Sequence, residues 1–339
     1  MSAEQMAAER LWDAADLAWV HGADPYALSG ASAVEFLHAE HSPAGVEPCV
    51  IIDTDWNIDD MMSIPSILAN RHVAAIVTTR GMSVPSVAAD GLHAFLSPFF
   101  GETSLADLSI PVIEGLGVSS PLEDQPWLPP LRASQARIND FLRVPYEPDE
   151  QAVTALELRG AVASAVETCD NVELLLIGPF TSYAAYADVL GDRVGRVVMQ
   201  GRPAEGTPPD VVPSRSFNCG YDADSCADAY PDLLRSNPYW VDVPRGGPVA
   251  YQPSLEMVMG LEPAGLPGAL RNVLLGEQHT WNPPVLPPGA SSLLWDQTAA
   301  QFLLDPSGFQ RNGRIWEPEM PPLELQERWT DSINQWPYG

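Results

Sequence analysis

The sequence predicts an α/β protein: a single domain built on a Rossmann-like, mixed but mainly parallel sheet flanked by helices. Three observations predict it. Short apolar segments of strand length recur along the chain, and many of the segments between them carry apolar residues at helical spacing. Alternating strands and helices are typical of a sheet covered on both faces. The first apolar run, 49–53, ends on an acid, and such sheets bind ligands beyond the carboxyl ends of their strands.

The predicted elements follow one another in a regular order. CVIID (49–53) is a near-continuous apolar run, typical of a buried parallel strand, and 59–70 has helical spacing. Further strands are predicted at 73–79, 110–115, 172–178, 194–201 and 240–243. Further helices are predicted at 84–100, 151–168, 181–190, 222–235 and 291–304, and the chain after 243 is expected to be mostly helical.

Two regions stand apart from this alternation. Residues 1–48 are expected to form an N-terminal extension, with a helix at 4–20, packed on the main domain 49–339. The Pro-rich region 118–150 is expected to be irregular. Long irregular loops in compact domains are usually functional, so this region is predicted to cover the active site.

The charge of the chain excludes several classes of function. The formal net charge is −28, and every Lys or Arg position is Arg. An acidic surface repels phosphates, which excludes nucleic acid as a partner, and a chain without lysine cannot form a Schiff base. No apolar run reaches the roughly 18–20 residues that span a bilayer. The N-terminal residues do not resemble a secretory signal. We therefore expect a cytoplasmic protein that does not bind membranes.

The four cysteines are Cys49, Cys169, Cys219 and Cys226. No pair has C-x-x-C spacing, so neither a zinc site nor a disulfide framework is expected. Buried free thiols are the default expectation for such cysteines.

An acidic cluster follows the first strand. DTDWNIDD places Asp53, Asp55, Asp59 and Asp60 within one short segment. Carboxylates this close raise one another's pKa, and a hard, oxygen-binding cation such as Ca²⁺ relieves the repulsion. The alternative is an acidic turn that caps the next helix. Four acids directly after a strand favour the metal site, although the spacing does not match a calcium-binding EF-hand.

Residues 53–60 fit the D-x-D-x-x-x-D-D motif that follows the first strand of nucleoside hydrolases. Four further segments resemble that family in the same order: LLLIGPFTSYAAYADVL (174–190), VVMQG (197–201), SFNCGYDADSCADAY (216–230) and SSLLWDQTAAQFLLDP (291–306). The chain is therefore similar to the nucleoside hydrolases over residues 49–306. The resemblance implies their fold and hydrolysis of an N-glycosidic bond.

The resemblance also implies a metal centre. One Ca²⁺ would be bound by Asp55, Asp60, Asp296 and the backbone carbonyl of Thr181, with Asp53 supporting the loop from behind. The cation would also bind the nucleophilic water and two sugar hydroxyls. Asp55 would act as the general base on that water.

Two further residues are implied as partners of the sugar. Asp59 and Asn218 would bind ribose hydroxyls while an oxocarbenium-like transition state develops. Both are therefore grouped with Asp55 and Trp295 as catalytic candidates. The alternatives are that Asn218 stabilises a turn and that Thr181 serves only as a helix N-cap.

The sequence departs from the family beside the leaving base. Trp295 stands where pyrimidine-tolerant members have His, and together with Asn57 it resembles the purine-specific branch, so both residues are expected to bind the substrate. In that branch, stacking on Trp raises the basicity of the leaving purine. Other stacking candidates are Trp56, Trp127 and Trp281, although each could instead pack in the core. His279 could supply the missing acid.

A second departure concerns the 5′ side of the sugar. Ser216 stands where the family has Glu, and the family's Asn partner is missing. Arg80, Arg202 and Arg215 occupy these neighbourhoods. Guanidinium groups suit phosphate and carboxylate, so a substrate that is anionic at its 5′ side is one hypothesis.

Three functions remain open. The first is a purine-leaning, Ca²⁺-dependent nucleoside hydrolase. The second is a specialised-metabolism glycosidase or glycosyl transferase acting on a 5′-modified or anionic nucleoside. The third is a calcium-dependent sugar- or nucleoside-binding protein without turnover, which the intact Asp55 disfavours. In each case the partner is a small nucleoside-like molecule, and the resemblance implies a homodimer or homotetramer.

Overall fold

The sheet of the computed structural model contains eight strands within the described residues, in the order β3-β2-β1-β4-β5-β6-β8-β7. These residues are 48–100, 110–118, 120, 122, 128–144, 153–201, 217–236, 238–244, 251–276, 294–313 and 315–336. The strands are β1 (Cys49–Thr54), β2 (His72–Thr78), β3 (Val112–Glu114), β4 (Val172–Leu176), β5 (Val194–Gln200), β6 (Pro238–Val241), β7 (Phe309–Asn312) and β8 (Ile315–Pro318). Only β7 and β8 pair antiparallel, so the predicted mixed, mainly parallel sheet is confirmed.

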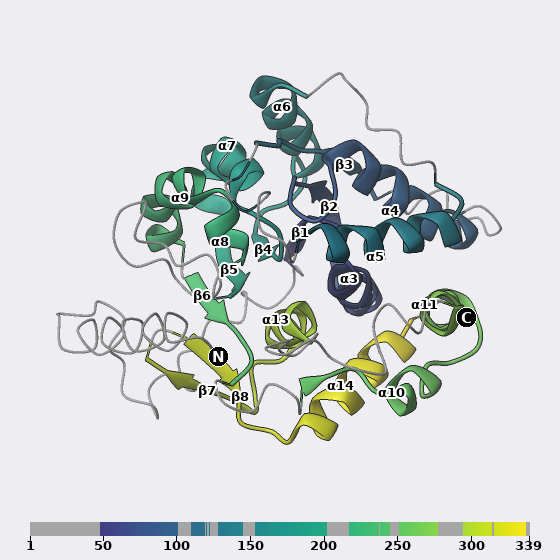
Figure 1. Ribbon diagram of the computed structural model, residues 1–339. Helices are drawn as coiled ribbons and strands as arrows, with labels where there is room; N and C mark the ends of the chain where they lie inside the picture. The colour runs from purple at the N-terminus through teal and green to yellow at the C-terminus, as the bar shows by residue number, and fades with distance from the viewer. Residues whose placement is uncertain are drawn as a thin grey trace, which may run out of the picture.

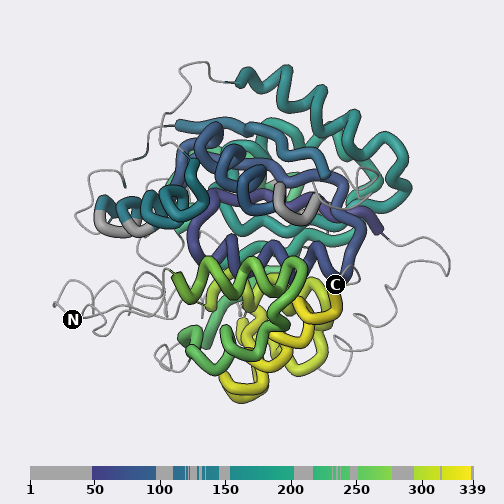
Figure 2. Tube along the Cα trace, turned by 90° about the vertical axis from the view of Figure 1, so that its right-hand side faces the viewer, coloured from purple at the N-terminus to yellow at the C-terminus, as the bar shows by residue number. Residues whose placement is uncertain are grey.

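Helices cover both faces of this sheet. They are α3 (Ile58–Asn70), α4 (Pro85–Phe100), α5 (Leu128–Phe141), α6 (Ala155–Ala165), α7 (Thr181–Leu190), α8 (Phe217–Tyr221), α9 (Ala223–Arg235), α10 (Leu255–Met259), α11 (Gly265–Gly276), α13 (Trp295–Leu304) and α14 (Pro322–Asn334), with a short 3₁₀ turn at Gly191–Arg193. Figure 1 shows α6, α7 and α9 on one side of the sheet and α13 and α14 on the other. In Figure 2 the C-terminal green and yellow helices gather as a layer beneath the sheet.

The side chains of β1 alternate between two hydrophobic cores. Val50 and Ile52 belong to the core shared with α3, α11, α13 and α14. Cys49 and Ile51 belong to the core shared with α6, α7 and α9. Successive residues of a strand point to opposite faces, so a strand buried on both faces is apolar throughout until it reaches the acids at its end.

The predicted strands and helices agree with the structure in most of the chain. Two regions differ from the prediction. The Pro-rich region predicted to be irregular contains the 14-residue helix α5. The C-terminal part, predicted to be mostly helical, also contains the β7–β8 hairpin, which extends the sheet beyond β6. The predicted helix at 4–20 lies outside the described residues. Among the residues that are described, no helix combines the length and apolar composition needed to cross a bilayer.

The prediction of four free thiols is wrong. Cys49 is joined to Cys169, and Cys219 to Cys226. Cys49 begins β1 and pairs in register with Val172 of β4, which brings Cys169 beside it. Spacing along the sequence carries no information about this contact, because strand pairing creates it. Disulfides are typical of oxidising compartments, so cytoplasmic localisation stays a prediction.

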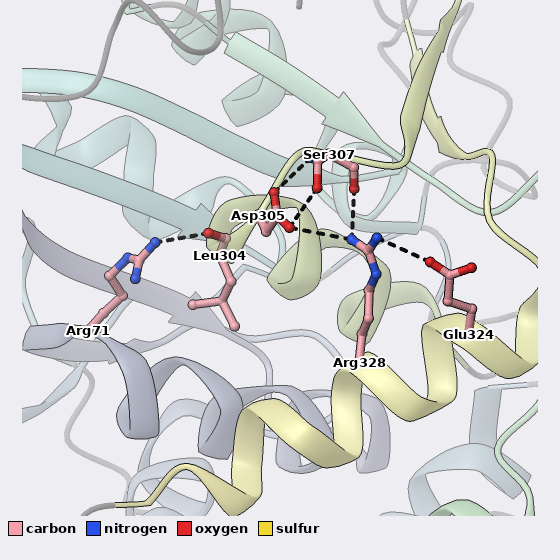
Figure 3. Close-up of polar contacts among 6 residues, drawn as sticks. All are labelled: Arg71, Leu304, Asp305, Ser307, Glu324 and Arg328. Atoms are coloured by element: carbon pink, nitrogen blue, oxygen red, sulfur yellow. Dashed lines mark hydrogen bonds and ion pairs between the residues drawn. The ribbon is translucent and has the colours of Figure 1, made fainter.

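The C-terminal end of α13 is held by two arginines from other parts of the sheet and its helices. Arg71, the C-cap residue of α3, donates to the carbonyl of Leu304 at 3.0 Å, as Figure 3 shows. Arg196 of β5 donates to the carbonyl of Leu303 at 2.8 Å. Cations are favourable at a helix C-terminus, where the carbonyls lack intrahelical partners.

Arg328 of α14 secures the turn that follows α13. It donates to the carbonyl of Ser307 at 2.8 Å and forms ion pairs with Asp305 at 3.5 Å and Glu324 at 3.2 Å (Figure 3). Exposed pairs of this kind each contribute little. The turn they connect follows the end of α13 that lies away from the acidic cluster.

Candidate metal centre and active site

The acidic cluster lies where β1 turns into α3. Asp53 and Thr54 end the strand, and Asp59 and Asp60 occupy the first turn of the helix. Between them Trp56 has a positive φ of 54°, which is unfavourable for a bulky residue. Strained backbone of this kind concentrates at functional sites. The bend turns the chain sharply enough to bring the strand acids beside the helix acids.

Three carboxylates from two distant segments converge at this point. Oxygen atoms of Asp59, Asp60 and Asp296 lie within 4.8 Å of one another, and all three side chains are buried. Asp296 comes from the first turn of α13. Asp60 also hydrogen bonds to Asp55 and to Asp296, so Asp55 belongs to the same group. The structure thus brings together all three predicted carboxylate ligands, and it adds Asp59 to them.

Burial and mutual repulsion raise the pKa of every acid in the group. Burial raises the pKa of Asp55 to about 7, with a further upward contribution from Asp59. Burial and Asp60 raise the pKa of Asp59 to about 8. Burial, followed by neighbouring carboxylates, raises the pKa of Asp60 and Asp296 well above the ordinary range. Without a cation, these carboxyl groups therefore hold protons near neutral pH.

Each acid is oriented by hydrogen-bond donors. Thr54 donates its hydroxyl to Asp60, and the Asn57 backbone N–H donates to Asp60 Oδ2 at 2.9 Å. The Asn57 side chain hydrogen bonds to Asp59, which lowers the pKa of that carboxyl against the effect of burial. Asn57, predicted to bind substrate, is thus the N-cap residue of α3 with its side chain on Asp59.

Asp53 lies behind the group, in the supporting place predicted for it. Its carboxylate accepts from Thr79 Oγ1 at 2.5 Å and from the Tyr186 hydroxyl at 3.2 Å. Thr79 Oγ1 is 2.6 Å from Ser182 Oγ, so β1, the residue after β2, and α7 meet here. Burial raises the pKa of Asp53 to about 7, although the hydrogen bonds from Thr79 and Tyr186 oppose this rise.

Asp55 is enclosed by the loop after β2 and the loop after β4. Met82 N donates to Asp55 Oδ2 at 2.8 Å, and Ser83 N donates to the Asp55 carbonyl at 3.1 Å. A Cβ on Gly81 would lie 2.0 Å from Asp55 Oδ2, and a Cβ on Gly178 would lie 2.9 Å from Asp55 N. Both positions therefore need glycine so that the backbone can approach the acid.

Asn218 and Thr181 lie at the same edge of the sheet. Asn218 of α8 donates its amide to the Ile177 carbonyl at 3.0 Å and to Gln200 Oε1 at 3.1 Å. These two hydrogen bonds fix the orientation of the side-chain amide and leave Asn218 Oδ1 as a possible acceptor for a ligand. Thr181 begins α7 and donates its hydroxyl to Asp222 Oδ2 at 2.6 Å. The role of its backbone carbonyl as a metal ligand stays a prediction.

The other predicted site residues fall into three groups. Trp295 begins α13 beside Asp296, and it is partly buried against the core. The Arg80 side chain runs along Gly117 after β3, since a Cβ on Gly117 would lie 2.8 Å from Arg80 Cβ. Ser216, His279, Trp127, Trp281, Arg202 and Arg215 lie outside the described residues.

Trp56 is not a stacking partner for a substrate base. Its side chain is fully buried, packs against Phe95, and donates its indole N–H to Asn139 Oδ1 at 3.1 Å. A Cβ on Gly91 would lie 2.2 Å from the indole nitrogen. The indole therefore anchors the loop between β1 and α3 to α4 and α5, which is the core-packing role given above as the alternative for this residue.

Some residues of the site were not predicted from the sequence. Gln297 of α13 donates to the Asp59 carbonyl at 3.3 Å, and Gln200 holds Asn218. The loop at 81–83 acts through backbone groups, which any sequence supplies. A buried Gln next to Asp296 in an apolar helix is the one feature that the sequence could have flagged.

No protein-family model matches the sequence, and no curated protein matches it. Comparison with solved structures gives a clear result for the fold. The purine-preferring ribonucleoside hydrolase from Gardnerella vaginalis is 15% identical, with a TM-score of 0.54, over 84% of this chain and 99% of that chain. The inosine-uridine preferring nucleoside hydrolase from Bacillus anthracis is 13% identical, with a TM-score of 0.54, over 85% of this chain and 99% of that chain.

A third similar structure is an effector protein. The type III effector XopQ, complexed with adenosine diphosphate ribose, is 15% identical, with a TM-score of 0.57, over 91% of this chain and 99% of that chain. At sequence identities this low, the structural similarity establishes a shared architecture alone. The chain has the α/β fold of the nucleoside hydrolases.

Proposed function

We propose that this protein hydrolyses the N-glycosidic bond of a ribonucleoside, with Ca²⁺ as its cofactor. The observation that carries the proposal is the meeting of Asp55, Asp59 and Asp60 with Asp296 in one buried group. Buried like charges are unfavourable unless something neutralises them. The fold supports the proposal, because two of the similar structures are nucleoside hydrolases.

The donor chemistry of the group fits Ca²⁺. The side-chain atoms that converge are carboxylate oxygens, which hard cations prefer, and Asp59 Oδ1 is buried with no hydrogen-bond partner among the described residues. Asp55, Asp60 and Asp296 would hold the ion, and the Thr181 carbonyl would add a neutral ligand. When bound, the cation would neutralise the group and lower the pKa of a water that it binds.

The residues then divide the work of hydrolysis. Asp55 accepts the proton of the water that attacks the anomeric carbon, while the carbon–nitrogen bond breaks and its electron pair leaves with the base. Asp59 and Asn218 Oδ1 accept hydrogen bonds from ribose hydroxyls. The surrounding carboxylates favour a sugar that becomes cation-like in the transition state.

The leaving base is best matched by a purine. Trp295 lies one residue before Asp296 and is only partly buried, so its ring can stack on a base. We expect a higher kcat/KM for inosine than for uridine. We expect Trp295→Leu to reduce inosine turnover more than uridine turnover.

The test is base release measured by chromatography, with purine and pyrimidine nucleosides as substrates. Asp55→Ala and removal of calcium with EDTA should each abolish release. Asp331→Asn, an exposed acid on α14, serves as the matched control and should retain wild-type activity. Release that persists in EDTA would rule out calcium dependence. No release from any substrate would leave the binding-protein alternative.

A second candidate is a substrate with a phosphorylated 5′ position. The observation that favours it is the XopQ structure, whose ligand is adenosine diphosphate ribose. The test compares kcat/KM for inosine and for its 5′-monophosphate, with adenosine diphosphate ribose as a competitor. A higher value for the monophosphate supports this candidate, whereas equal or lower values reject it.

A further inference from the structure

Arg132 of α5 is connected to the proposed general base through a single peptide group. Its Nη2 atom donates to the Gly81 carbonyl oxygen at 2.7 Å. The N–H of the next residue, Met82, donates to Asp55 Oδ2 at 2.8 Å. The carbonyl of Gly81 and the N–H of Met82 belong to the same planar peptide unit and point in opposite directions. The Arg132 guanidinium therefore binds the carbonyl end of this peptide group, and the Asp55 carboxylate binds its N–H end.

This peptide group has little freedom to move. A Cβ at Gly81 would lie 2.0 Å from Asp55 Oδ2, which shows how closely the backbone packs on the acid. Gly81 N donates to the Ser83 carbonyl at 3.1 Å, and Ser83 N donates to the Asp55 carbonyl at 3.1 Å. The loop is thus tied to Asp55 at both its side chain and its backbone. Arg132 holds this loop from the helix side.

Arg132 also contacts helix α8. Nη2 lies 3.0 Å from the Tyr221 hydroxyl, at the end of the helix that carries Asn218. Around this contact Met82, Leu128 and Tyr221 pack together with Leu122. Arg132 therefore joins the loop beside Asp55 to α8.

We propose that Arg132 is a positioning residue for Asp55 and acts on it through the Gly81–Met82 peptide group. Hydrogen bonds in series polarise one another, so a permanent positive charge at the carbonyl makes the N–H a stronger donor. The stronger donor fixes Oδ2, so that the other oxygen of Asp55 faces the reacting water. The inference rests on the proposed function, because it assigns a helper to the proposed base.

The kinetic test uses four variants. Arg132→Ala should lower kcat about tenfold, which corresponds to about 1.4 kcal/mol, and should leave KM within about twofold, because the interaction matters in the chemical step. Arg132→Lys keeps a charge near Gly81 and should recover part of the loss. Tyr221→Phe removes only the contact with α8 and should have little effect on kcat. Arg137→Ala, an exposed residue of the same helix, is the matched control.

A spectroscopic test does not depend on turnover. The chain has nine methionines, so selective ¹⁵N-methionine labelling gives few amide signals, and Met82→Leu identifies that of Met82. In the calcium-free protein, Arg132→Ala should move the Met82 amide proton upfield, as expected for a weakened hydrogen bond. Tyr221→Phe and Arg137→Ala should leave it in place.

The outcomes separate the inference from the proposed function. If the wild type releases no base from any substrate, the proposed function fails. A shifted Met82 signal would then show only that Arg132 strengthens the hydrogen bond to Asp55, and a role in catalysis would be rejected. If the wild type is active, an unchanged kcat or an unchanged Met82 signal in Arg132→Ala overturns the inference alone. An effect of Tyr221→Phe as large as that of Arg132→Ala also overturns it, because Arg132 would then act through α8.

Discussion

Gln297 Nε2 donates to the backbone carbonyl of Asp59 at 3.3 Å, and this contact joins the first turn of α13 to the first turn of α3. The two turns supply Asp296, Asp59 and Asp60. At the far end of the same two helices, Arg71 of α3 donates to the Leu304 carbonyl of α13. The pair of helices is therefore fastened at both ends, and the spacing of the carboxylates follows from that.

Gln297→Met is predicted to weaken calcium binding about tenfold or more, since residues that orient metal ligands typically contribute 10–100-fold to affinity. Stability should change by less than about 1 kcal/mol. The Asp59 carbonyl keeps a hydrogen bond from Ser63 Oγ at 2.7 Å, and the buried Gln297 Oε1 has no partner in the part of the chain that the structure describes. Isothermal titration with Ca²⁺ and urea unfolding measure the two quantities. Weakened binding with an equally large loss of stability would point to general disruption instead.

Asp296→Asn is predicted to have opposite effects on the metal-free and the calcium-loaded protein. Burial first, and then repulsion from Asp59, Asp60 and Asp55, raises the pKa of Asp296, so an amide at this position relieves an unfavourable burial, and the metal-free variant should have a higher Tm than the wild type. The same change removes a proposed ligand, so added Ca²⁺ should no longer raise Tm. Thermal unfolding with and without calcium measures both effects, and Asp331→Asn is the control. A calcium-dependent rise in Tm that survives in Asp296→Asn would remove this residue from the ligand set.

The stability of the metal-free protein is predicted to fall as the pH rises. The folded-state pKa values of Asp53 and Asp55 are about 7 and that of Asp59 is about 8, all above the ordinary value near 4. The folded state binds more protons than the unfolded state in this window. The stabilisation that these protonated carboxyl groups contribute is therefore fully present below about pH 4 and is lost progressively up to about pH 8.

Calcium should reverse this trend, because the ion replaces the protons on the same carboxyl groups. Its affinity should rise over the same pH range. Thermal melts from pH 5 to 8, in EDTA and in excess calcium, test both statements. A metal-free Tm that does not change with pH would contradict the shifted pKa values.

The sequence predicted the positions of β1 to β6 along the chain and the place of the acids, because both follow from local pattern. An apolar run that is buried on both faces and ends in DTDWNIDD specifies a central parallel strand and its functional edge. Asp296 needed more than local pattern, since only the resemblance to a family connected it with residues at the other end of the chain. The meeting of the two segments is confirmed in the fold.

What the sequence missed depends on tertiary contacts or on backbone groups. The Pro-rich composition around α5 concealed a helix whose Arg132 and Asn139 contact the site loop. The β7–β8 hairpin is short, and its β7 strand is largely exposed, so it lacks the apolar run of a buried strand. The disulfides arise from the pairing of β1 with β4 and from the packing of α8 on α9, which spacing alone does not encode.

The two disulfides are predicted to contribute unequally to stability and to function. Cys49 and Cys169 are 120 residues apart and Cys219 and Cys226 are 7 apart, so the entropy of loop closure gives about 5 and about 2 kcal/mol respectively. The short bridge encloses Asp222, which holds Thr181, and begins beside Asn218. Breaking it with Cys226→Ala and Cys219→Ala should therefore raise KM while lowering stability modestly.

The long bridge lies at the amino end of β1, at the opposite end of the strand from the acids. Breaking it with Cys49→Ala and Cys169→Ala should lower the free energy of unfolding more and leave KM unchanged. Urea unfolding and steady-state kinetics on both double variants make the comparison, and each serves as the control for the other. Equal losses of stability would argue against the loop-length account, and an unchanged KM in the short-bridge variant would show that α8 holds Asn218 without the disulfide.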